Sequence, residues 1–222
     1  MNETNATQRL RLYLIRHGEV EGAAARKLLG RTDSPLSERG LEQSHLLAEL
    51  LSTVRLSAIY SSDLQRAIVM AETIAKRSKL KVEQDSAWRE IDMGEWECRL
   101  IALLHNEAPE LVAQLFNDPA SFEYPGGESF SAFTVRIQRA QDQLLRTHRS
   151  GEVALVTHGG VCRAIIGSAL GIPPQHWLRL AQDYGCLNVI DWYDGNPMLR
   201  LLNRGSFGGR DVLMVEQGEG IS

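Results

Sequence analysis

Two short apolar runs, each followed by a histidine and a glycine, constrain the fold of this chain more than any other feature. Residues 12–15 (LYLI) lead into RHGE at 16–19, and residues 153–157 (VALVT) lead into HGG at 158–160. Unbroken apolar runs of this length are typical of buried parallel strands. Because open α/β sheets bind ligands at the carboxyl ends of their strands, the pattern predicts two imidazoles side by side at one edge of a sheet.

The size and composition of the chain favour one α/β domain with an insertion. Its 222 residues are 43% hydrophobic and carry a formal net charge of −4, with no basic block, so we expect no nucleic-acid and no membrane partner. The N-terminal segment lacks the apolar core of a secretion signal, and no apolar stretch is long enough to cross a bilayer. Three cysteines without zinc-ligand spacing indicate reduced thiols and a cytoplasmic location.

Local signals predict the elements that follow the first histidine. Ser37 is expected to cap a helix that begins directly after it. Residues 58–60 indicate a short strand, and Ser62 with Gln65 three residues later fits a capping box, so a second helix is expected there. Arg66 falls in the first turn of that helix, where the helix N-terminus and the guanidinium both attract an anion.

The second half of the chain predicts an insertion, a helix and a hairpin. Residues 97–128 contain proline and glycine turns around short helices that break near Pro109, and we interpret them as an inserted cap. An apolar stripe predicts a core-facing helix after Ser129, and two apolar runs around residues 194–196 indicate a hairpin. Together the elements predict a three-layer α/β/α fold with a mostly parallel sheet.

Five charged or titratable side chains are expected near the predicted sheet edge: Arg16, His17, Arg66, Glu90 and His158. Two arginines and two histidines around one point favour a phosphoryl group, because guanidinium forks match phosphate oxygens. The sequence has no Gly-Lys-Ser/Thr triplet of a nucleotide-binding loop and no metal-ligand set, so we expect no metal and no other cofactor. Such phosphoryl chemistry needs a protein nucleophile, and a histidine kept neutral by neighbouring cations can supply it.

Six motif blocks follow one another along almost the whole chain. They are residues 16–19 (RHGE), Gly30 with 34–40 (SPLSERG), 60–67 (YSSDLQRA), 89–97 (REIDMGEWE), 125–129 (PGGES) and 157–160 (THGG). In this order they resemble the motifs of the histidine phosphatase superfamily, the phosphoglycerate mutase-like proteins. Residues 182–186, 190–191 and 199–203 further resemble the C-terminal hairpin of its α-ribazole phosphatase group. The resemblance implies a phosphoglycerate mutase-like fold, with residues 1–222 as a single domain.

The resemblance also implies a role for each matched residue. His17 is expected to attack phosphorus and to carry the phosphoryl group. Arg16, Arg66 and His158 are expected to hold the equatorial oxygens, with help from the backbone amide of Gly159.

Two matched positions remain. Gly30 is expected in the substrate loop, and Glu90 is expected to protonate the leaving oxygen and then to deprotonate the attacking water. Only the motif singles out Glu90 from three neighbouring acids, which are Asp92, Glu95 and Glu97. Other histidines are interpreted as surface or packing residues: His45, His105, His148 and His176. Five aromatic residues fit either the core or the wall of a binding mouth: Trp88, Trp96, Phe116, Phe122 and Tyr124.

Three positions depart from the pattern that the chain resembles. Val20 stands where members often have Thr or Ser, Ala23 where they often have Asn, and Cys98 where they usually have Gly. The first two changes remove polar donors near the phosphate loop. They leave open whether activity is weakened or the substrate preference is redirected.

Four functions are compatible with these residues, and each takes a small phosphomonoester as its partner. The sequence leaves open whether the chain forms a homodimer. The first is metal-independent hydrolysis of α-ribazole 5′-phosphate in cobalamin nucleotide-loop assembly, through a phosphohistidine. The second is a broad-specificity phosphatase of small phosphorylated metabolites. The third is a phosphoglycerate mutase, and the fourth is a non-catalytic phosphate-binding protein. The C-terminal hairpin favours the first.

Overall fold

Six strands form one mixed sheet within residues 8–25 and 27–205, the part of the chain that the computed structural model describes. The strand order is β3-β2-β4-β1-β5-β6, with the first four strands parallel and the last two antiparallel to their neighbours. The strands are β1 (Arg9–Arg16), β2 (Ala58–Ser61), β3 (Val82–Gln84), β4 (Gly151–Thr157), β5 (Leu187–Tyr193) and β6 (Asn196–Arg204). The predicted α/β fold with a mostly parallel sheet is confirmed.

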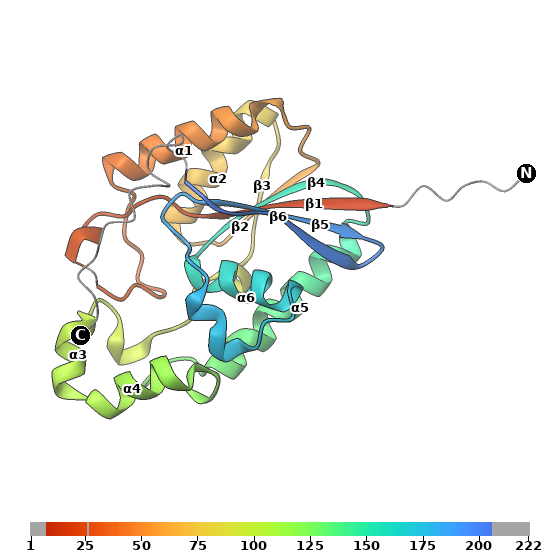
Figure 1. Ribbon diagram of the computed structural model, residues 1–222. Coiled ribbons are helices and arrows are strands. Elements are labelled where there is room, and N and C mark those ends of the chain that lie inside the picture. The colour runs from red at the N-terminus through yellow and green to blue at the C-terminus, as the bar shows by residue number, and fades with distance from the viewer. Residues whose placement is uncertain (1–7, 26, 206–222) are drawn as a thin grey trace, which may run out of the picture.

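Helices cover both faces of the sheet, with α1 and α2 on one face and α5 and α6 on the other (Figure 1). The α-helices are α1 (Glu38–Leu50), α2 (Gln65–Ser78), α3 (Ile101–Glu107), α4 (Pro109–Asn117), α5 (Phe130–Thr147) and α6 (Gly159–Ala169). Short 3₁₀ turns are η1 (Ala23–Ala25), η2 (Leu51–Thr53), η3 (Ser86–Trp88), η4 (Gly94–Trp96), η5 (Pro119–Ser121) and η6 (Pro174–Arg179). No helix among the described residues is both long and apolar enough to span a membrane.

The central strand β1 contributes to the core on both faces. Leu12 and Leu14 pack in the cluster that contains α5 and α6, and Tyr13 and Ile15 pack in the cluster that contains α1 and α2. This alternation follows from the two-residue period of a strand, and it explains why residues 12–15 form an unbroken apolar run.

The register between β1 and β4 brings the two predicted imidazoles together. The strands run parallel, and Arg16 pairs with Thr157 at the last register position. Each strand therefore ends one residue before its histidine, and the His17 N–H donates to the Thr157 carbonyl over 2.8 Å. The rings of His17 and His158 lie 5.1 Å apart between centroids.

The first two helices begin in different ways. The predicted cap of α1 is confirmed, because the Ser37 hydroxyl accepts a hydrogen bond from the Gly40 N–H at 3.1 Å. The predicted capping box of α2 is wrong, because Leu64 is the N-cap residue and the Gln65 N–H does not donate to Ser62. Asp33 instead accepts a hydrogen bond from the Gln65 N–H at 2.9 Å, and the Ser62 hydroxyl accepts a long one from the Leu64 N–H at 3.4 Å.

Residues 97–128 contain α3 and α4, which meet at Ala108. Pro109 is the first residue of α4, a position where the helix needs no backbone N–H, so the predicted break is confirmed. The aromatic residues weighed above belong mostly to the core, since Phe116 is 58% exposed and the other four are buried. Three of them make ring contacts with centroids 5.0 to 5.7 Å apart: Trp96, Phe122 and Tyr124.

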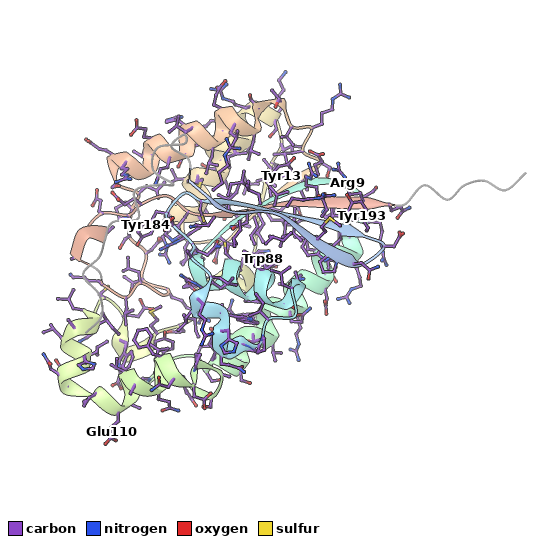
Figure 2. The ribbon with its side chains drawn as sticks, viewed as in Figure 1. Arg9, Tyr13, Trp88, Glu110, Tyr184 and Tyr193 are labelled. Atoms are coloured by element: carbon purple, nitrogen blue, oxygen red, sulfur yellow. The ribbon has the colours of Figure 1, made fainter. Side chains whose placement is uncertain are left out.

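The predicted C-terminal hairpin is formed by β5 and β6, with Asp194 and Gly195 at its turn. Both turn residues have a positive φ, as two-residue hairpin turns require. Figure 2 shows Tyr184, just before β5, at the opposite end of the sheet from Arg9 and Tyr193. Because β1 begins at Arg9, Tyr184 lies at the end of the sheet where β1 delivers its histidine.

Candidate active site

His17 presents one defined nitrogen lone pair. Its Nδ1 lies 2.8 Å from the Gly18 carbonyl oxygen, and Arg66 Nε lies 3.2 Å from its Nε2. A carbonyl oxygen only accepts and a guanidinium only donates, so Nδ1 carries the proton and Nε2 carries the lone pair. The result is a buried neutral imidazole whose unprotonated nitrogen faces a cation.

Arg66 is fixed by backbone carbonyls. Its Nη2 donates to Gly30 O at 2.6 Å and its Nη1 to Thr32 O at 2.7 Å. The side chain is buried, and its ion pair among the described residues is a long one, 3.8 Å to the partly exposed Asp33. The guanidinium is therefore held in place without a close carboxylate, which leaves its charge available to an anion.

Arg16, the last residue of β1, lies at the same edge of the sheet. Its Nη1 donates to the Gln182 carbonyl, and its guanidinium carbon lies 3.9 Å from the centroid of the Tyr184 ring. That ring is also 5.6 Å from the His17 ring. Among the described residues, the buried Arg16 Nε has no hydrogen-bond partner. Such a donor beside His17 suits an anionic oxygen.

His158 is fully buried beside His17, and its Nε2 lies 2.8 Å from the Ser62 hydroxyl. Its Nδ1 has no hydrogen-bond partner within the described part of the chain. Ser62 is thus a site residue that the sequence analysis missed, because a Ser followed by Gln three residues later is also the signature of a helix cap.

Glu90 is tied to the start of α6. Its carboxylate accepts hydrogen bonds from the Ile91 N–H at 3.0 Å and from the Gly160 N–H at 2.8 Å. A Cβ at Gly160 would lie 2.1 Å from Glu90 Oε1, so this approach requires glycine. These two hydrogen bonds hold the carboxyl group at the start of α6, directly after His158.

The rival acids of the same motif have other partners. Asp92 pairs with Arg31 at 3.0 Å, and Glu95 is exposed. Glu97 accepts backbone N–H groups of residues 30–32. Of these four acids, Glu90 is the one that accepts a hydrogen bond from the segment that carries His158, and its role as acid and base stays a prediction.

Arg136 of α5 holds the segment that carries Glu90. Its guanidinium donates to the carbonyls of Ala87 and Arg89 at 2.9 Å each and pairs with Glu128 at 2.8 Å. Arg136 lies next to an apolar helix stripe, and nothing in that context signals a role at the site.

Burial and nearby cations lower the pKa of both site histidines. For His17 burial is the largest cause, followed by the charges of Arg66 and Arg16, while the bond to the Gly18 carbonyl opposes them. For His158 burial again dominates, followed by Arg66 and His17. The expected effect of the cations is therefore present, but burial contributes more to keeping the imidazoles neutral.

The structure brings Arg16, His17, Arg66, Glu90 and His158 to one end of the sheet with the backbone of Gly30 and Gly159. A Cβ at Gly159 would lie 3.4 Å from Arg16 Nε, which puts the first residue of α6 beside that guanidinium. No group of three or more His, Cys, Asp or Glu side chains that could hold a metal occurs within the described residues.

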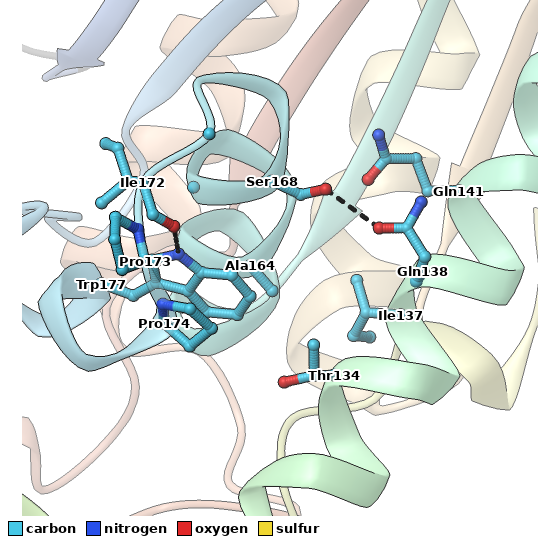
Figure 3. A pocket seen from close by; sticks show the side chains of 12 residues that line it. Thr134, Ile137, Gln138, Gln141, Ala164, Ser168, Ile172, Pro173, Pro174 and Trp177 are labelled. Carbon is cyan, nitrogen blue, oxygen red and sulfur yellow. Dashed lines mark hydrogen bonds between the residues drawn. The ribbon is translucent and has the colours of Figure 1, made fainter. Parts of the chain in front are cut away.

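One of the other histidines and a second cavity lie away from this site. The other histidines include His148, which contacts the Tyr60 hydroxyl at 2.8 Å. A separate cavity of about 310 Å³ lies between α5 and α6, and Figure 3 shows the residues that line it. Its wall includes Trp177, whose Nε1 donates to the Ile172 carbonyl at 2.8 Å. None of the predicted site residues lines this cavity.

Fold and site together place two arginines and a neutral histidine at the carboxyl edge of an α/β sheet, an arrangement that suits an anionic ligand. Residues 12–205 match the histidine phosphatase superfamily (branch 1), and the chain belongs to that superfamily. The resemblance to this superfamily that the motif blocks predict is thereby confirmed.

Some similar proteins are named as phosphoglycerate mutases and others as α-ribazole phosphatases. The "Probable phosphoglycerate mutase GpmB" of Yersinia enterocolitica is 34% identical over 190 residues, which cover 86% of this chain and 88% of that protein. The solved structure of a "putative alpha-ribazole-5'-P phosphatase" from Escherichia coli is 30% identical, with a TM-score of 0.82 over 90% of this chain and 98% of the other. The α-ribazole phosphatase from Shigella flexneri is 31% identical, with a TM-score of 0.81 over 87% and 96% of the two chains.

Proposed function

We propose that this chain is a metal-independent phosphomonoester hydrolase that passes the phosphoryl group through His17. The observation that carries the proposal is the neutral His17 imidazole, whose Nε2 lone pair lies 3.2 Å from Arg66 Nε. A fixed cation beside a lone pair draws the phosphoryl dianion onto the nucleophile and stabilises the charge that spreads over its oxygens.

The reaction has two steps. In the first, a bond forms between His17 Nε2 and phosphorus while the bond from phosphorus to the ester oxygen breaks. Glu90 in its protonated form gives its proton to that oxygen, so a neutral alcohol leaves. In the second, a water oxygen bonds to phosphorus, the bond to His17 breaks, and the Glu90 carboxylate takes the proton of the water.

Four groups are assigned to the non-bridging oxygens: Arg16, Arg66, His158 and the backbone amide of Gly159. Arg16 Nε and His158 Nδ1, which lack a hydrogen-bond partner within the described residues, support this assignment, because buried donors and acceptors normally have partners. The position of Gly159 at the start of α6 supports it as well, since helix N-termini attract anions.

We propose α-ribazole 5′-phosphate, in cobalamin nucleotide-loop assembly, as the substrate. The names of two similar solved structures and the C-terminal hairpin support it. The name of the Yersinia relative supports a second candidate, a phosphoglycerate mutase, in which the phosphohistidine returns its phosphoryl group to the substrate rather than to water. A broad-specificity phosphatase would use the same chemistry with less discrimination.

The test is kcat/KM, in the presence of EDTA, for α-ribazole 5′-phosphate beside p-nitrophenyl phosphate. A large preference for the ribazole ester is the expected result. Equal and modest turnover of both esters would keep the hydrolase and reject the ribazole substrate. Conversion of 3-phosphoglycerate to 2-phosphoglycerate without hydrolysis would favour the mutase, and binding of esters without any turnover would reject an enzyme.

We also propose that residues 97–128 act as a cap over the site within a single domain. Figure 1 shows α3 and α4 beyond the carboxyl end of β1, which supports the assignment. Replacement of residues 101–117 by a flexible linker should raise KM for the larger ribazole ester more than for p-nitrophenyl phosphate. An unchanged ratio of the two KM values would reject the cap.

A further inference from the structure

One peptide group of the loop at residues 30–32 lies between two opposite charges. Its carbonyl, from Gly30, accepts a hydrogen bond from Arg66 Nη2 at 2.6 Å. Its N–H, from Arg31, donates to Glu97 Oε1 at 2.7 Å. The negative end of the peptide dipole thus faces the guanidinium and the positive end faces the carboxylate, so each bond polarises the peptide in favour of the other.

Glu97 holds the rest of this loop as well. Its carboxylate also accepts the N–H groups of Gly30 at 3.2 Å, of Thr32 at 3.1 Å and of Met93 at 3.2 Å. The Thr32 carbonyl in turn accepts from Arg66 Nη1 at 2.7 Å. A Cβ at Gly30 would lie 2.3 Å from Glu97 Oε1, so the close approach of loop and carboxylate requires glycine.

The contact needs a carboxylate rather than a side chain of the same shape. Four N–H donors converge on the two oxygens of Glu97, and an ionised carboxylate offers acceptors only. A carboxamide would offer one oxygen and would turn its own N–H groups toward other donors. The negative charge of Glu97 also favours the charged form of Arg66, whose pKa is lowered by burial.

We propose that Glu97 is a positioning residue for the phosphoryl site, which fixes the Arg66 guanidinium against His17 Nε2 through the Gly30–Arg31 peptide. The inference rests on the proposed function, because it takes Arg66 as a ligand of the phosphoryl oxygens. In the described residues Glu97 bonds to backbone N–H groups, so its effect on the reaction passes through Arg66.

The test compares Glu97→Gln with Glu95→Gln, which removes an exposed carboxylate two residues earlier in the same motif. Inorganic phosphate is the probe, and its binding is measured by titration calorimetry. We expect the affinity for phosphate to fall about tenfold in Glu97→Gln, in the range of direct couplings within a hydrogen-bonded network, and to stay unchanged in Glu95→Gln.

The pH profile separates positioning from a loss of folded protein. An Arg66 that has moved away lowers the pKa of His17 less, so the acid limb of kcat/KM should shift to higher pH in Glu97→Gln. A variant that is only less stable would lose amplitude at an unmoved pH. If Glu97→Gln does not fold, Glu97→Asp, which keeps the charge but shortens the reach, should show the same shift to a smaller extent.

A double-mutant comparison tests whether Glu97 acts through Arg66. In an Arg66→Ala background, Glu97→Gln should weaken phosphate binding little further, because both changes act on the same guanidinium. Additive losses, or wild-type phosphate binding and an unmoved acid limb in Glu97→Gln, would overturn the inference. A wild-type chain that binds phosphate but hydrolyses no ester would reject the proposed function alone, whereas absence of phosphate binding would reject both.

Discussion

At the scale of single residues, the lowered pKa values of His17 and His158 tie stability to pH. An imidazole in the unfolded chain titrates near about pH 6.5. In the fold both rings stay neutral to lower pH, chiefly because they are buried. Below about pH 6.5 the unfolded state therefore binds more protons, and stability that is present above this pH is lost as the pH falls. We expect the free energy of unfolding to drop by about 1 kcal/mol per imidazole between pH 7 and 5.5.

Urea denaturation at the two pH values measures this loss. His17→Asn should reduce the pH-dependent loss by about 1 kcal/mol, because one of the two neutral imidazoles is gone. The exposed His105→Asn variant controls for the loss of an imidazole as such. An equal pH dependence in wild type and His17→Asn would contradict the assignment of a lowered pKa to His17.

The contact between Gly160 and Glu90 gives a second test at this scale. In Gly160→Ala the new Cβ would meet Glu90 Oε1 at 2.1 Å and displace the proposed acid. Acid catalysis is typically worth about 10²–10⁴-fold, and it matters most for a poor leaving group. We therefore expect kcat to fall about 10²-fold or more for an alkyl phosphate such as the ribazole ester, and less for p-nitrophenyl phosphate.

Glu90→Gln is the matched comparison, because it keeps the shape of the side chain but removes the acid. Both variants should discriminate between the two esters in the same way. Equal losses on both esters, in either variant, would remove Glu90 from its proposed role.

At the scale of elements, two serines near helix starts have different roles. Ser37 caps α1, so Ser37→Ala should lower the free energy of unfolding by about 1 kcal/mol. Ser62 lies 2.8 Å from His158 Nε2 and accepts only a long bond of 3.4 Å from the Leu64 N–H, so Ser62→Ala should mainly lower kcat/KM. Urea denaturation and ester hydrolysis, measured on both variants, separate the two effects. A Ser62→Ala variant that lost stability and kept its kcat/KM would show that Ser62 stabilises the start of α2 rather than the site.

The elements also show what the sequence can and cannot reveal. The apolar runs before His17 and His158 predict two parallel strands, and in-register pairing of such strands is enough to place the imidazoles together. The contact of Ser62 with His158 spans 96 residues, and that of Arg136 with Arg89 spans 47. No periodic pattern within one segment of the sequence predicts such contacts, because they depend on how separate elements pack.

At the scale of the whole molecule, an aromatic cluster joins residues 97–128 to the body of the protein. Phe122 is 1% exposed and contacts the rings of Trp96 and Tyr124, whereas Phe116 is 58% exposed. Phe122→Ala should therefore lower the free energy of unfolding by about 3–5 kcal/mol, and Phe116→Ala by less than about 0.5 kcal/mol. A urea transition in which Phe122→Ala matched Phe116→Ala would show that this cluster does not stabilise the fold.

Hydrolysis by the proposed route requires a phosphoryl group carried by His17, and trapping that intermediate is the most direct test. The wild-type chain is mixed with radiolabelled p-nitrophenyl phosphate, quenched in alkali within milliseconds and digested, and the label is located by mass spectrometry. We predict a base-stable, acid-labile phosphate on the peptide that contains His17, and neither label nor hydrolysis in His17→Ala. Label on another residue, or full hydrolysis by His17→Ala, would contradict the account.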